Sequence, residues 1–141
     1  MTRTSPFSGP VARLVLICGF GLGGPGFAAA QSAYLWEELG SGDGLTVSYN
    51  PLTVKVRDGM ATFLEKVAYA TPAPLPNGQA MSYYTVSMTI DCAADTYAHA
   101  DFTAYGTEGS VIPNVNDPTP SGMNPIAAGG APAAFKAKFC K

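Results

Sequence analysis

Between residues 34 and 105, apolar and polar residues alternate with a period of two, which favours β-strands over helices. The alternation is carried by five runs, at residues 45–49, 52–57, 60–70, 83–92 and 97–104. Asp58-Gly59 joins the second run to the third and is a tight-hairpin signal, because glycine adopts positive φ without steric cost. The pattern predicts neighbouring antiparallel strands with one face toward a core.

The parity of each run predicts which side chains face that core. In the fourth run the apolar set is Tyr84, Val86, Met88, Ile90 and Cys92. In the fifth run we expect Ala98, Ala100, Phe102 and Ala104 to face inward, with Tyr97, His99, Asp101 and Thr103 outward. Tyr83, Tyr97 and Tyr105 thus fall on polar parities, where large amphipathic rings serve contacts or pair across strands.

Two segments lack a sustained period, and a short helix is predicted after the second one. Residues 71–78 carry Pro72, Pro74 and Pro76 and are interpreted as a loop, because proline cannot donate to a sheet ladder. Residues 106–130 are rich in Pro, Gly and Asn and predict a long loop, functional or mobile. Pro132 suits the first turn of a helix, on which Phe135 and Phe139 form an apolar stripe.

The first thirty residues are typical of an export signal. Basic residues precede an apolar run, Leu14 to Phe20, and small residues at 28–30 suit cleavage after Ala30. This leaves a mature domain at 31–141. Two alternatives are a transmembrane anchor, which the glycine-interrupted run is too short to form, and a lipid anchor at Cys18, for which Ile17 is a bulky preceding residue.

Export changes the meaning of charge and cysteine content. Without Arg3 and Arg13, six of the eight Lys and Arg residues remain against ten acids, a formal charge of −4 that disfavours nucleic acid as a partner. Without Cys18, Cys92 and Cys140 remain as a pair, for which we expect a disulfide rather than two buried thiols. That bridge would tie the C-terminal helix to the sheet.

Few residues suggest catalysis. His99 is the one histidine, with Asp101 on the same strand parity, and no serine or cysteine in a nucleophile setting accompanies it. His99, Asp101 and Asp91 lack the spacing of zinc ligands. We therefore expect no catalytic residue, metal site or cofactor. Tyr83, Tyr97, His99 and Tyr105 remain as a candidate contact surface.

The order of landmarks along the chain resembles the surface-adhesin protein E-like family of exported bacterial proteins. The matching segments are Trp36, Asp43-Gly44, Asn50-Pro51, Asp58-Gly59, Tyr69 to Pro72, Leu75 to Gly78, Ile90 to Cys92, Thr103 to Tyr105, Asp117-Pro118 and Phe139-Cys140. The resemblance implies a mainly β (α+β) fold, with one antiparallel sheet of about six strands and a short C-terminal helix. The name-giving member is a surface lipoprotein that binds host matrix proteins. The segment 117–129 lacks the Trp usual in that family's loop after the sixth strand.

Together these features predict an exported, non-enzymatic binding or adhesion-like module that meets extracellular or envelope proteins, in the periplasm or on the outer cell surface. One alternative is a periplasmic carrier of a small aromatic or haem-like ligand, built from Tyr97, His99 and Tyr105. Another is a structural component of the envelope.

Overall fold

The computed structural model describes residues 35–141. The predicted export signal and Cys18 lie outside the described residues. The elements, in chain order, are β1 (Glu37–Gly42), β2 (Leu45–Tyr49), a 3-10 turn η1 (Pro51–Thr53), β3 (Lys55–Arg57), β4 (Met60–Pro74), β5 (Ala80–Asp91), β6 (Thr96–Tyr105), β7 (Val111–Ile112), β8 (Asn124–Pro125) and α2 (Ala131–Phe139). In this described part, no helix has both the length and the apolar character that a membrane span requires.

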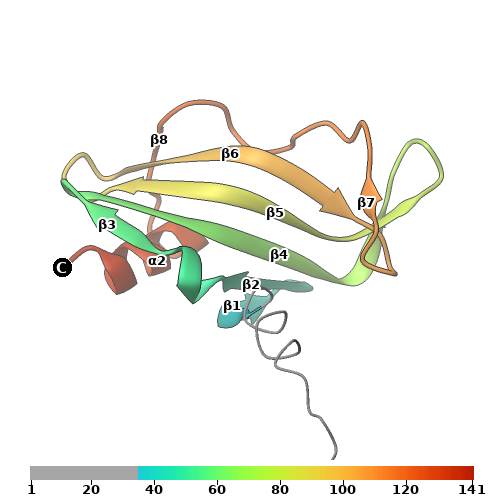
Figure 1. The fold of residues 1–141 in the computed structure, drawn as a ribbon, viewed down its shortest axis with the longest axis horizontal. Coiled ribbons are helices and arrows are strands. Elements are labelled where there is room, and N and C mark those ends of the chain that lie inside the picture. Colours follow the sequence, from blue (N-terminus) through green and yellow to red (C-terminus); the bar gives the residue numbers. More distant parts are fainter. Residues whose placement is uncertain (1–34) are drawn as a thin grey trace, which may run out of the picture.

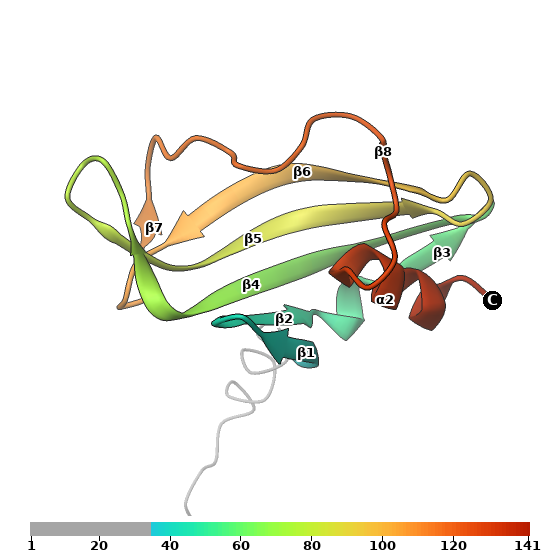
Figure 2. The same cartoon turned by 180° about the vertical axis from the view of Figure 1, so that it is seen from behind.

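One antiparallel sheet forms the body of the domain, as predicted (Figure 1). Its strand order is β1-β2-β4-β5-β6-β7, while β3 pairs with β4 beyond the end of β2, and β8 pairs with β6. The sheet has eight strands rather than about six, because the long loop contributes the two-residue strands β7 and β8. Figure 2 shows α2 lying across one face of the sheet near one end, while the β7–β8 connection arches along β6.

The prediction that residues 71–78 form a loop is wrong for the first half of the segment. β4 continues to Pro74, where Ala73 pairs with Met81 and Pro74 with Ala80 after a shift in register. β2 pairs with β4 only as far as Tyr69, so Pro72 and Pro74 lie where β4 has no partner on that side in the described chain. Proline is tolerated there because a missing N–H costs little at a sheet edge.

The predicted facing of β6 is wrong for its first half. A register shift between Thr85 and Ser87 on β5 places one extra residue in β6, and Asp101 adopts a φ of 56°. This β-bulge reverses the parity, since side chains alternate faces along a strand. Tyr97 and His99 therefore lie on the core side, opposite Ile90 and Met88. Phe102 and Ala104 face inward as predicted.

The main core lies between the sheet and α2, on what we call the covered face. Phe135 is completely buried, with its ring centroid 4.5 Å from that of Phe63, and Phe139 lies 5.2 Å from Tyr49. The predicted Phe135/Phe139 stripe is confirmed as the packing surface of the helix. Burying one such ring stabilises the fold by about 1.5–3 kcal/mol, so the two rings contribute strongly to the docking of α2.

Covalent and ionic links fix the helix in this position. Cys92, just after β5, forms the predicted disulfide with Cys140, just after α2, with a Cα–Cα distance of 5.5 Å. Lys136 contacts Asp95 at 2.6 Å and Lys138 contacts Glu37 at 2.9 Å. The helix is thereby connected to the β5–β6 turn on one side and to β1 on the other.

The loop at residues 106–130 packs along β6. Ile112 is buried in a second apolar cluster with Met81 and Ala104, against which Val115 packs. The N–H group of Ile126 donates to the carbonyl of Asp95. The loop therefore covers the part of the covered face around Met81 and Ala104, whereas α2 covers the part around Phe63.

Candidate functional site

The four residues of the predicted contact surface divide between the two faces of the sheet. Tyr83 and Tyr105 lie on the face opposite α2, which we call the outer face, whereas Tyr97 and His99 lie on the covered face. Tyr97 packs against the main core. The bulge at Asp101 causes this division, so the four residues do not form one surface.

On the outer face, aromatic rings gather around one ammonium group. Tyr83 and Tyr105 are cross-strand partners whose rings stack with centroids 4.6 Å apart and planes inclined by 10°. Lys66 Nζ lies 4.4 Å from the centroid of Tyr83 and 5.5 Å from that of Trp36. These distances fall in the cation–π range, worth about 0.5–1 kcal/mol at exposed sites. We call Trp36, Lys66, Tyr83 and Tyr105 the aromatic cluster.

The register between neighbouring strands sets the geometry of the aromatic cluster. Lys66 occupies an outer-face position on β4, paired with Thr85, one diagonal step from Tyr83 on β5. All four side chains are half-buried, and Lys66, Tyr83 and Tyr105 lie on the adjacent strands β4, β5 and β6, so these three lose little rotamer entropy when they meet a partner. Sequence parity predicted the positions of Tyr83 and Tyr105, whereas the contribution of Trp36 and Lys66 depends on strand register and was not anticipated.

On the covered face, the one histidine faces a carboxylate. His99 Nε2 lies 3.4 Å from Glu65 Oε2, and the two side chains are 12% and 4% exposed. The second ring nitrogen, Nδ1, and Glu65 Oε2 have no hydrogen-bond partner among the described residues. His99 and Asp101, which share a parity in the sequence, lie on opposite faces of the sheet, and the Asp101 carboxylate accepts from the Ser87 hydroxyl. His99 is therefore part of a largely enclosed polar pair.

The surroundings of this pair are aromatic. The ring of Tyr97 meets that of His99 edge-on at 5.3 Å. Burial raises the pKa of the Tyr84 hydroxyl above its ordinary value, and the charge of Glu65 adds to the effect. Tyr84 thus remains neutral at physiological pH.

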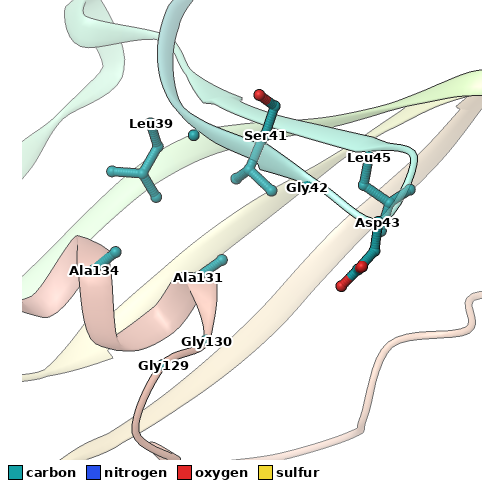
Figure 3. Close-up of a pocket in the computed structure, with 11 residues that line it drawn as sticks. Leu39, Ser41, Gly42, Asp43, Leu45, Gly129, Gly130, Ala131 and Ala134 are labelled. Atoms are coloured by element: carbon teal, nitrogen blue, oxygen red, sulfur yellow. The ribbon is translucent and has the colours of Figure 1, made fainter.

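A cavity of about 490 Å³ opens between the β1–β2 hairpin and the start of α2 (Figure 3). In the close-up, Ala131 and Ala134 face the hairpin, and Leu39 points toward the helix. Glycines and small apolar side chains form most of its wall, and Asp43 lies at the tip of the hairpin. Its volume suits a small molecule, but its walls carry few groups that would orient one.

At the other end of α2, Glu37, Tyr49 and Lys138 form a polar contact. Hydrogen bonds from Tyr49 and Lys138 lower the pKa of the Glu37 carboxyl. Burial, together with the bond to Glu37, raises the pKa of Tyr49. The contact holds β1 to the last turn of the helix and is structural in character.

Comparison with known proteins identifies a family. A family model described as surface-adhesin protein E matches residues 36–141, which is all of the domain from Trp36 onward. No curated protein and no solved structure matches the chain. A match over most of the chain, together with the antiparallel sheet, the C-terminal helix and the Cys92–Cys140 bridge, shows that the chain belongs to the surface-adhesin protein E family.

Proposed function

We propose that this domain is a non-enzymatic binding module, exported to the cell surface, that attaches to an extracellular protein through the outer face of its sheet. The observation that carries the proposal is the aromatic cluster, which occupies the face opposite α2 in a member of an adhesin family. Export rests on the sequence pattern of residues 1–30.

The chemistry of the cluster suits a protein partner. Tyrosine and tryptophan are enriched at the centres of protein interfaces, because they bury large areas with few rotatable bonds. The stacked pair Tyr83–Tyr105 is fixed by the register of β5 and β6, and Lys66 adds a charge beside the rings. A partner that covered these side chains would bury apolar area without ordering a loop.

The position of His99 argues against a small-ligand site that it would share with the outer-face tyrosines. Its ring is 12% exposed and lies on the covered face, so a molecule bound to the aromatic cluster would be on the other side of the sheet. Tyr105 is likewise separated from Tyr97 and His99. A single small-ligand site that combined these three residues is therefore not favoured.

The proposal is tested by binding of the oxidised domain to extracellular matrix deposited by cultured epithelial cells and then cleared of cells. Tyr105→Ala and Lys66→Ala should each weaken binding about fivefold or more, as expected for central interface residues. Met123→Ala, which removes a side chain that is 49% exposed elsewhere, is the matched control and should bind as the parent does. Circular dichroism verifies the fold of each variant. Equal binding by all the variants, or no binding above albumin-coated plates, would contradict the proposal.

A further inference from the structure

The segment from η1 to β3 forms an exposed edge of the sheet. β3 pairs with β4 on one side, and no described strand pairs with it on the other. The large apolar side chains of Leu52 and Val56 are 64% and 54% exposed along this segment. Unpaired backbone groups beside exposed apolar side chains are typical of an edge that accepts a strand from a partner.

This edge also carries positive charge. Lys55 and Arg57 alternate with Val56 and so project to the same face, where their register partners are Thr62 and Met60. These four residues line a shallow hollow of about 260 Å³. Within residues 35–141 neither cation has an ion-pair partner, whereas Lys136 and Lys138 on α2 are both paired.

Two acids lie near this hollow, and neither forms an ion pair with Lys55 or Arg57. Asp91 lies across β4 from the hairpin, opposite Met60, and its carboxylate accepts the N–H groups of Ala93 and Ala94. Asp58 forms the β3–β4 turn with a φ of 50°. Among the described residues, Lys55 and Arg57 are therefore open to ion pairs with the carboxylates of a partner.

From these observations we propose that the β3 edge binds an extended acidic segment of a partner protein by strand addition. Cations at positions i and i+2 of a strand are about 6.7 Å apart, which is also the spacing of alternate side chains in an added strand. Carboxylates at every second residue would then meet Lys55 and Arg57 in register, while backbone bonds form along β3. Leu52 and Val56 provide apolar contact at the rim.

The observations favour an acidic protein segment over a sulfated glycan. Glycan and nucleic-acid sites usually carry dense runs of basic residues, whereas this edge has two cations and two exposed apolar side chains. Charged edges also discourage pairing between identical copies. That effect is consistent with an acidic partner, since a segment of opposite charge would neutralise the edge.

The inference adds the chemistry of the partner to the proposed function, on which it rests, and it concerns residues outside the aromatic cluster. The probe is a fluorescein-labelled ten-residue peptide of alternating Glu and Thr, measured by fluorescence anisotropy at low salt. Binding should weaken about tenfold or more in the double variant Lys55→Glu/Arg57→Glu. Lys141→Glu, at the exposed C-terminus, is the control and should leave binding within about twofold of the parent.

Three further probes separate strand addition from other modes of binding. The same peptide N-methylated at alternate residues should bind at least tenfold more weakly, because it cannot form the backbone bonds. A Lys-Thr peptide should not bind. Equal binding of the methylated peptide, or binding of a heparin fragment in place of the Glu-Thr peptide, would overturn the proposal. A dimer that becomes monomeric in the double variant, without peptide binding, would also overturn it.

The two proposals fail in different ways. In one outcome, Tyr105→Ala loses matrix binding, Lys55→Glu/Arg57→Glu keeps it, and the parent does not bind the Glu-Thr peptide. The β3 inference then falls and the proposed function stands. If the parent binds the Glu-Thr peptide as expected but not the matrix, strand addition of an acidic segment at β3 stands, while its assignment to surface attachment falls with the proposed function.

Discussion

Removing the Cys92–Cys140 bridge should destabilise the domain chiefly through the unfolded state. The bridge joins residues 48 positions apart, and the chain-entropy description of a loop of this length gives about 4 kcal/mol. Domains of this size are stable by about 5–15 kcal/mol, so the loss is a large fraction of the total. The folded state should change little, because Phe135 is completely buried and its ring packs directly against that of Phe63.

The assay is urea unfolding of the Cys92→Ala/Cys140→Ala variant beside the oxidised parent, followed by near-ultraviolet circular dichroism. We expect a free energy of unfolding lower by about 4 kcal/mol, a somewhat larger m-value and an unchanged native spectrum. Phe135→Ala in the oxidised protein should cost about 3–5 kcal/mol and alter the native aromatic spectrum, because it leaves a cavity in the folded core. A loss below about 1 kcal/mol, or a native spectrum that collapses when the bridge is absent, would refute the reasoning.

Three other predictions concern local features. Hydrogen bonds lower the pKa of Glu37 in the folded state, so the stability that they contribute is present above the ordinary pKa of 4.5 and is lost as pH falls below that value. The difference in the free energy of unfolding between the parent and Glu37→Gln should therefore shrink in urea titrations from pH 6 to pH 3. Gly59 has a φ of +75°, so Gly59→Ala should cost about 1–2 kcal/mol in thermal unfolding, and an unchanged midpoint would exclude strain. Asp101→Val should cost a similar amount, and Asp101→Gly much less; equal losses would show that the bulge does not require positive φ.

Much of the fold follows from local chemistry that the sequence displays. Period-two alternation located β2, β4, β5 and β6, and Asp58-Gly59 marked the β3–β4 hairpin, where both residues adopt positive φ. The run at 52–57 was expected to be one strand, which is wrong for its first half, because the chain turns in η1 before β3 begins at Lys55. Phe135 and Phe139 are one helical turn apart, which identified the packing face of α2. The cysteine pair was predictable because Cys92 falls on the apolar parity of its strand and Cys140 follows the helix.

The facing of β6 could not be obtained by counting parity through the strand. Tyr97 and Phe102 have opposite parities, yet both face the core, because the bulge at Asp101 inserts one residue between them. Ala98, Ala100, Phe102 and Ala104 keep one parity across Asp101, so the sequence pattern hides the bulge. Because the sequence prediction did not include this bulge, it assigned His99 to solvent and missed its partner Glu65.

The aromatic cluster and the β3 edge depend on register, which single-sequence patterns specify weakly. Trp36 and Lys66 are thirty positions apart. They meet because their neighbours Glu37 and Glu65 are both register partners of Tyr49 on β2. The exposure of Lys55 and Arg57 follows from where β2 ends and β3 begins beside β4. Neither arrangement leaves a motif in the chain.

The claim that this domain acts outside the cell is tested most directly by adding protease to intact cells of the producing bacterium. The domain should be cleaved on intact cells as completely as on cells whose outer membrane has been opened, while a periplasmic marker stays intact until opening. Protection of the domain until the outer membrane is breached would contradict a surface adhesin.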